Sequence, residues 1–192
     1  MKDIVKLGGL LMLITAIAAT ALAGIYSVTK PRIDLQKQLT LENALTIALP
    51  EADSEAIIPV RSDSTGEVIY YKGFDSPDTS SLVGYAFVAK EPGYSSVLET
   101  MVGVDTTGDI IGMKALDQKE TPGLGTRIEE VKYGETDPWF QQQFIGKDAD
   151  DVAVEQDGGD IQSITGATIT SRAVTKSIVS AYEEFQQQKR EN

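Results

Sequence analysis

A short turn rich in hydroxyl groups, close to the C-terminus, is the segment of this chain best suited to bind an anion. Residues 165–171 read TGATITS and join a predicted strand to a predicted final helix. The first turn of a helix has unpaired N–H groups and the positive end of the helix dipole, and both attract phosphate. Gly166 and Ala167 would let a bulky group approach the backbone. The pattern is also typical of an ordinary helix cap, which is the commoner case.

Two further loops contain glycine and proline, and one of them could contribute to a binding site. Residues 120–125 read ETPGLG and follow a predicted strand, and residues 91–96 read EPGYSS and lie between two predicted strands. In the first loop, Pro122 and two glycines force an irregular backbone that a flat ligand could approach, whereas the second loop indicates only a turn. Taken alone, the pattern of the first loop favours an ordinary surface loop over a binding site.

The amino acids that the chain lacks restrict its chemistry, because it has no Cys and no His. Without Cys it forms no disulfide, no thiolate-bound iron–sulfur cluster and no Cys nucleophile. Without His it lacks the commonest general base and the usual ligands of zinc and haem, so we expect no metal site. Redox chemistry in this chain would therefore need an organic cofactor.

The chain is strongly acidic. It has 17 Lys and Arg against 29 Asp and Glu, a formal net charge of −12. Such a charge repels phosphate backbones, so we expect no nucleic-acid partner. Solubility is the simplest interpretation of the acidity.

An uncharged, apolar run at residues 7–29 is long enough to cross a membrane as a helix. A helix of that length spans about 35 Å, and the hydrocarbon core of a bilayer is about 30 Å thick. The alternative is a cleaved signal peptide, since Lys2 and Lys6 form a positive start and residues 21–23 read ALA, a possible cleavage pattern. The length of the run favours a retained transmembrane helix after a short tail at residues 1–6.

The rest of the chain is predicted to form one α+β domain. Residues 30–50 predict a helical connector that ends at Pro50, and residues 51–192 predict the domain itself. Runs of β-branched and aromatic residues, separated by tight turns such as 105–109, predict an antiparallel sheet with flanking helices. The predicted strands cover residues 68–71, 82–89, 97–104 and 110–116.

The C-terminal part of the domain is predicted to be mostly helical. A short helix is expected at residues 138–144, and residues 152–154 and 161–164 are expected to form a second hairpin around the turn at 157–159. Apolar residues at helical spacing predict a closing helix from about Ser171, whose polar last residues are expected to fray.

Three of these segments, in this order, resemble one known family. TGATITS closely resembles the flavinylation motif of the FMN-binding domain family, which includes the G subunit of Rnf electron-transport complexes and the C subunit of the sodium-pumping NADH:quinone reductase. ETPGLG is similar to the family's second signature, and residues 93–116 resemble the strand pair that precedes it. The core of the resemblance covers residues 83–180, and the apolar N-terminus agrees with the family's layout.

The resemblance implies a covalent cofactor: FMN esterified through its phosphate to Thr168 by a dedicated flavin transferase. Thr170 is the alternative acceptor. Gln162 stands where the family usually has Asp, and Asp160 lies two residues further upstream. The resemblance implies no catalytic residue, and it implies that further residues lie near the phosphate or the flavin ring, namely Ser163, Thr165, Gly166, Ala167, Thr170, Ser171, Glu120, Thr121, Pro122, Gly123, Leu124 and Gly125.

The implied function is electron transfer within a membrane-bound, ion-translocating oxidoreductase of the Rnf type. Reduced ferredoxin would be the donor and NAD the acceptor, both handled by other subunits. The domain would lie on the extracytoplasmic side of the cell membrane, with residues 1–6 in the cytoplasm and a single span in contact with lipid and other membrane subunits. The alternatives are the C subunit of the quinone reductase and an extracytoplasmic binding module without a redox role.

Overall fold

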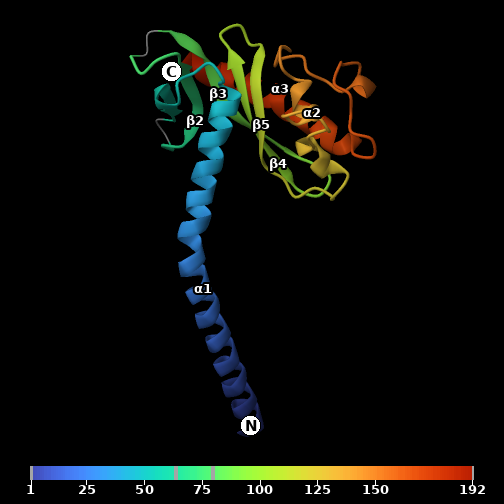
Figure 1. Ribbon diagram of the computed structural model, residues 1–192. Coiled ribbons are helices and arrows are strands. Elements are labelled where there is room, and N and C mark those ends of the chain that lie inside the picture. The colour runs from blue at the N-terminus through green and yellow to red at the C-terminus, as the bar shows by residue number, and fades with distance from the viewer. Residues whose placement is uncertain (1, 63–64, 79–80, 192) are drawn as a thin grey trace. The chain divides into compact units, whose positions relative to one another are not determined.

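The computed structural model describes residues 2–62, 65–78 and 81–191 of the chain (Figure 1). Contacts within the chain group it into two compact units, Met1–Leu41 and Glu42–Asn192.

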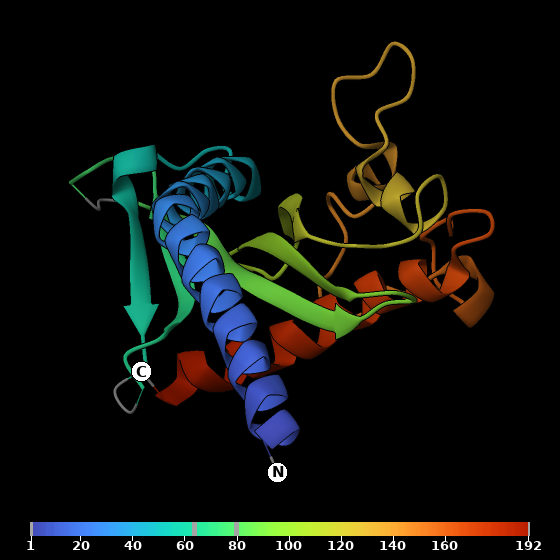
Figure 2. The ribbon, with the colours of Figure 1, turned by 90° about the horizontal axis from the view of Figure 1, so that it is seen from below.

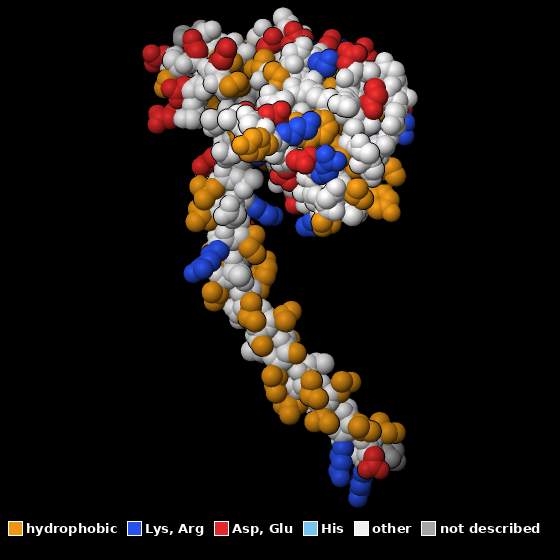
Figure 3. All heavy atoms as spheres, turned by 45° about the vertical axis from the view of Figure 1, so that its right-hand side comes forward, with side chains coloured by type: hydrophobic (Ala, Val, Ile, Leu, Met, Phe, Trp, Pro, Cys, Tyr) orange, Lys and Arg blue, Asp and Glu red, His pale blue; other side chains and the backbone are white. Residues whose placement is uncertain are grey.

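The first unit is helical throughout its described residues. Helix α1 (Lys2–Ala48) begins in it and continues past Pro31, so the predicted span and the predicted connector are parts of one helix. The side chains of residues 2–39 are exposed, and hydrophobic side chains cover much of this stretch on the face that Figure 3 shows. Among the described residues, α1 is the one helix long and apolar enough to cross a membrane, a criterion that a signal sequence also meets.

The second unit is built around a five-stranded antiparallel sheet in the order β1-β2-β3-β4-β5. Each strand pairs with the strand that precedes it in the sequence, as tight turns between short strands favour. This sheet and its helices confirm the predicted α+β class. The strands are β1 (Ile57–Arg61), β2 (Val68–Phe74), β3 (Leu82–Pro92), β4 (Val97–Asp105) and β5 (Ile110–Asp117).

Helix α3 (Thr168–Glu191) lies along one face of the sheet and packs mainly on β3 (Figure 2). Phe185 of α3 lies among three rings of the sheet, with centroids 5.1–5.3 Å from those of Tyr70, Tyr85 and Phe87. Such aromatic pairs stabilise a fold by about 0.5–1.5 kcal/mol each beyond the area they bury. Because this packing fixes α3 on the sheet, it also fixes where the first turn of α3 lies.

The last turn of α1, which belongs to the second unit, covers the other face of the sheet. Its backbone approaches two glycines that pair across β4 and β5, Gly103 and Gly112. A Cβ at Gly103 would lie 1.8 Å from the carbonyl oxygen of Ala48, and one at Gly112 would lie 2.1 Å from that of Ile47. The glycines therefore let the helix end rest directly on the sheet.

Shorter helices complete the second unit. Helix α2 (Trp139–Gln142) packs on the 3-10 helix η2 (Gly125–Glu129). Two further 3-10 turns are η1 (Ser54–Ala56) and η3 (Glu155–Asp157).

The structure corrects three expectations. The predicted second hairpin is wrong: Val154 and Ile161 form an isolated parallel bridge, because η3 occupies the place of the turn. Helix α3 begins at Thr168, earlier than Ser171, and it is helical to Glu191; near its end, Lys189 lies 4.1 Å from the ring centre of Tyr85. Strand β1 was not predicted, since it contains Pro59, which a strand tolerates at the edge of a sheet.

Candidate functional site

The three loops singled out in the sequence meet at one groove of the second unit, a cavity of about 520 Å³. The groove lies between the loop after β3, the loop after β5 and the first turn of α3. Its volume falls within the range of roughly 300–1,000 Å³ that is usual for small-molecule sites. The lining residues are Tyr94, Glu120, Thr121, Leu124, Gly125, Gly166, Ala167, Thr168, Ile169 and Thr170.

The first turn of α3 offers backbone N–H groups to this groove. Of its first four N–H groups, that of Ser171 donates to the carbonyl of Ala167 at 3.0 Å. Within the described residues, the N–H groups of residues 168–170 have no acceptor. Unpaired N–H groups and the dipole of a 24-residue helix give this end of the groove the electrostatics that attract an anion.

Thr168 and Thr170 differ in the state of their hydroxyl groups. Thr170 is 1% exposed, and its hydroxyl donates to Oε2 of Glu120 at 2.7 Å. Thr168 is half-buried, and its hydroxyl has no hydrogen-bond partner in the described part of the chain. Thr168 is therefore the more accessible nucleophilic oxygen of the two.

Glu120 joins the three loops. It is 5% exposed, and its carboxylate accepts from the N–H groups of Tyr94 at 3.2 Å, Ser95 at 2.9 Å and Ser96 at 3.0 Å. It also accepts from the hydroxyl of Ser96 at 3.2 Å and from that of Thr170. Burial raises the pKa of Glu120, but the hydrogen bonds from Thr170 and the backbone outweigh burial and hold the pKa below its usual value.

Glycines allow the loops to approach one another this closely. A Cβ at Gly125 would lie 2.6 Å from the Cβ of Glu120 and 2.8 Å from the Oγ1 of Thr170. Gly166 has a φ of +79°, and a Cβ there would lie 3.1 Å from a methyl group of Leu124. Both positions require glycine for the groove to keep its shape.

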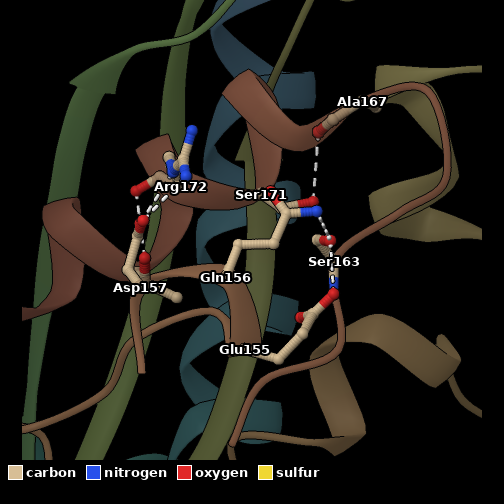
Figure 4. Close-up of polar contacts among 8 residues, drawn as sticks. Glu155, Gln156, Asp157, Ser163, Ala167, Ser171 and Arg172 are labelled. Atoms are coloured by element: carbon tan, nitrogen blue, oxygen red, sulfur yellow. Dashed lines mark hydrogen bonds and ion pairs between the residues drawn. The ribbon is translucent and has the colours of Figure 1, made fainter. Parts of the chain in front are cut away.

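A second set of polar contacts, outside the groove, holds the TGAT turn in place (Figure 4). Glu155 accepts from the N–H of Ser163 at 2.6 Å and from its hydroxyl at 2.8 Å. The hydrogen bond from the Ser163 side chain lowers the pKa of Glu155. Arg172 donates two hydrogen bonds of 2.7 Å to Asp157, and the hydroxyl of Ser171 accepts from the N–H of Ile164 at 2.9 Å. These contacts fix both ends of the TGAT turn.

The structure brings most of the predicted site residues together, although their contacts with a cofactor remain predictions. Glu120, Thr121, Leu124, Gly125, Gly166, Ala167, Thr168 and Thr170 line the groove. Pro122 and Gly123 belong to the same loop but do not line it, and Ser163, Thr165 and Ser171 flank the turn outside it.

Sequence reasoning missed two lining residues, Tyr94 and Ile169. Tyr94 lies in the EPGYSS loop, whose pattern indicated only a turn. Ile169 is 54% exposed, and exposed isoleucine between two threonines gave no signal until the helix start was known.

Gln162 is exposed at the position where the resemblance would place Asp. Its N–H donates to the side-chain oxygen of Gln143 at 2.8 Å. Asp160 pairs instead with Lys147 at 3.2 Å.

Comparison with known proteins decides the family. Residues 93–183 match the sequence model of the FMN-binding domain, and residues 1–46 match that of the RnfG N-terminal region. The chain is 33% identical over 184 residues to the G subunit of the ion-translocating oxidoreductase complex of Methanosarcina acetivorans, covering 94% of this chain and 93% of that protein. It is also 33% identical over 190 residues to the corresponding protein of Aliivibrio fischeri strain MJ11, covering 93% and 89%.

The chain belongs to the G-subunit family of ion-translocating oxidoreductase complexes. It therefore has an FMN-binding domain at residues 93–183 and is an electron-transfer subunit of such a complex, as the resemblance implied. Among solved structures, NqrC of Shewanella oneidensis resembles this chain with 23% identity and a TM-score of 0.43, covering 69% of this chain and 66% of that one.

Proposed function

We propose that this protein carries FMN as a phosphoester of Thr168 and passes electrons between other subunits of an Rnf-type complex. The observation that carries the proposal is the half-buried Thr168 hydroxyl, unpartnered within the described residues, at the start of α3 and in the wall of the groove. Thr170 fits the role of acceptor less well, because its hydroxyl is buried and donates to Glu120.

The residues of the groove fit the chemical parts of FMN. A phosphate ester on Thr168 would lie beside the unpaired N–H groups of residues 168–170. The apolar side chains of Leu124 and Ile169 and the ring of Tyr94 offer surfaces for a flat aromatic ring. Bound FMN would supply the electron-transfer chemistry, which the chain, without Cys or His, cannot supply itself.

The role of the protein is then to hold the flavin and to orient its ring. A tethered cofactor cannot diffuse away, so the groove can remain shallow and open. Electron transfer requires a short distance and a suitable orientation between two redox centres, and matching reduction potentials. It requires no general acid or base from the chain. A flavin transferase would form the ester by attack of the Thr168 hydroxyl on the flavin-bearing phosphate of a flavin dinucleotide, whose other nucleotide would leave with the proton. The electron donor and acceptor, ferredoxin and NAD in this proposal, would bind to other subunits.

We place the protein in the cell membrane through one retained span at residues 7–29, in contact with lipid, with residues 30–50 as a helical connector. The domain at residues 51–192 would lie outside the cytoplasm. The length and apolar character of α1 support a span.

The test of the proposal is in-gel flavin fluorescence after co-expression with a flavin transferase and separation on a denaturing gel. We expect a fluorescent band for the wild type and a dark band for Thr168→Ala. The matched control is Thr136→Ala, which removes an exposed hydroxyl of another loop, away from the groove and from the TGAT turn, and should leave the band bright. A bright Thr168→Ala band that turns dark in Thr170→Ala would move the attachment site. A dark wild-type band would refute the covalent ester and leave FMN bound to the domain without one.

A further inference from the structure

Glu120 is a buried carboxylate for which the proposed function has no use. Its hydrogen-bond donors come from the loop after β3 and from α3, positions 24–26 and 50 residues away in the sequence. Within the described residues no Lys or Arg pairs with it. Five neutral donors therefore surround the carboxylate of a residue that lines the groove.

The hydrogen-bond donors around Glu120 stabilise the ionised form of its side chain. Consecutive N–H groups at residues 94–96 converge on the carboxylate, as anion-binding backbone nests do. A protonated carboxyl would turn one acceptor oxygen into a donor and lose part of this set. Neutral donors stabilise the charge but do not cancel it, so the groove has one negative charge in its wall.

Small residues are required on both sides of this carboxylate. A Cβ at Gly93 would lie 2.8 Å from Oε1 of Glu120, and one at Gly125 would lie 2.8 Å from Oε2. Glu120 therefore cannot move away from the groove without disturbing the loops on either side.

We propose that Glu120 is a positioning residue that fixes the walls of the groove, and that its charge lowers the reduction potential of the flavin held there. This inference rests on the proposed function. Reduction of a flavin by two electrons with uptake of one proton adds one negative charge to the ring. A carboxylate in the wall disfavours that added charge, and the low dielectric of a protein interior strengthens the effect.

The experiment is a spectroelectrochemical titration of the flavin-loaded full chain, wild type against Glu120→Gln. Glutamine keeps the size of the side chain and one acceptor oxygen but removes the charge. We expect a more positive midpoint potential for Glu120→Gln. The matched control is Glu130→Gln, because Glu130 also accepts hydrogen bonds from two side chains, Arg127 and Trp139, but does not line the groove. Its potential should equal that of the wild type.

A second variant separates charge from general loosening of the loops. Ser96→Ala removes one hydroxyl donor to Glu120 and keeps the carboxylate. If charge sets the potential, Ser96→Ala leaves it unchanged or makes it more negative, opposite in sign to Glu120→Gln. Shifts in the same positive direction for both variants, or no shift for Glu120→Gln, would overturn the proposal.

The two proposals fail in different ways. A wild-type band that is dark in the gel refutes attachment at Thr168, and the titration is then repeated with FMN added to the full chain, where the same signs are expected for Glu120. A bright band with equal potentials in wild type and Glu120→Gln refutes the role of Glu120 alone.

Discussion

Two threonines at the groove, Thr168 and Thr170, differ in burial and in hydrogen bonding. Thr168 has an accessible hydroxyl in the groove wall, whereas Thr170, only two positions away, has a buried one that donates to Glu120. The sequence marked both threonines as possible acceptors, because local composition cannot tell which hydroxyl is used for structure. That distinction depends on Glu120, which is 50 residues distant in the chain.

Gly125 should tolerate no side chain. In Gly125→Ala the new Cβ would meet Glu120 and Thr170 at 2.6–2.8 Å, so we expect a loss of about 1–3 kcal/mol in the free energy of unfolding. Urea denaturation of the detergent-solubilised chain measures it. Gly123→Ala is the comparison: Gly123 has a φ of +75° but open space around it, so only a backbone cost of roughly 1–2 kcal/mol is expected. Of the two, only Gly125→Ala should also change the absorption spectrum of the bound flavin.

The contribution of Glu120 to stability should depend on pH. Its pKa is lower in the folded chain than in the unfolded one, so the folded state is stabilised above the ordinary pKa of about 4.5, and the stabilisation disappears as pH falls through the folded pKa. We expect wild type to be more stable than Glu120→Gln at pH 7, with a difference that shrinks steadily below pH 4.5. Urea midpoints across this range test it, and a difference independent of pH would contradict the assignment.

Among the secondary-structure elements, the sheet and α3 determine the position of the groove. The four strands rich in β-branched and aromatic residues, β2 to β5, could be predicted from the sequence because their alternation and turns are local signals. Strand β1 could not, since it is short and contains Pro59. The start of α3 was also misplaced, because threonines 168 and 170 have low helix propensity and tertiary packing holds them in the helix.

The contact between the last turn of α1 and the glycine pair Gly103 and Gly112 can be tested by mutation. In Gly103→Ala the new Cβ would overlap the carbonyl oxygen of Ala48, so the last turn of α1 must lift from the sheet. We expect a loss of about 1–3 kcal/mol in the free energy of unfolding. Gly24→Ala is a control within α1, where nothing lies within 4 Å, and it should not lower stability. Equal unfolding curves for Gly103→Ala and wild type would show that the helix end is not fixed on the sheet.

For the whole molecule, the sequence predicted the apolar helix from length alone but left its orientation open. Positive charges lie at both ends of the apolar run, so their count favours neither side. The absence of Cys makes orientation directly measurable, because an introduced Cys will be unique in the chain.

We expect Tyr133→Cys, at a fully exposed position of the domain, to react with a membrane-impermeant maleimide in intact cells. Asp3→Cys, at the other end of the predicted span, should react only after the membrane is opened. Labelling in the reverse order would place the domain in the cytoplasm. Release of wild-type chain from washed membranes would contradict the retained span.

Attachment of FMN to Thr168 is tested most directly by peptide mass spectrometry that locates the modified threonine. The chain has no Lys or Arg between Lys147 and Arg172, so trypsin releases one peptide, residues 148–172, that contains every candidate hydroxyl of the turn. We predict that this peptide carries the mass of FMN less one water, and that fragment ions assign the added mass to Thr168. An added mass on Thr170, or an unmodified peptide from chain co-expressed with an active flavin transferase, would contradict the account.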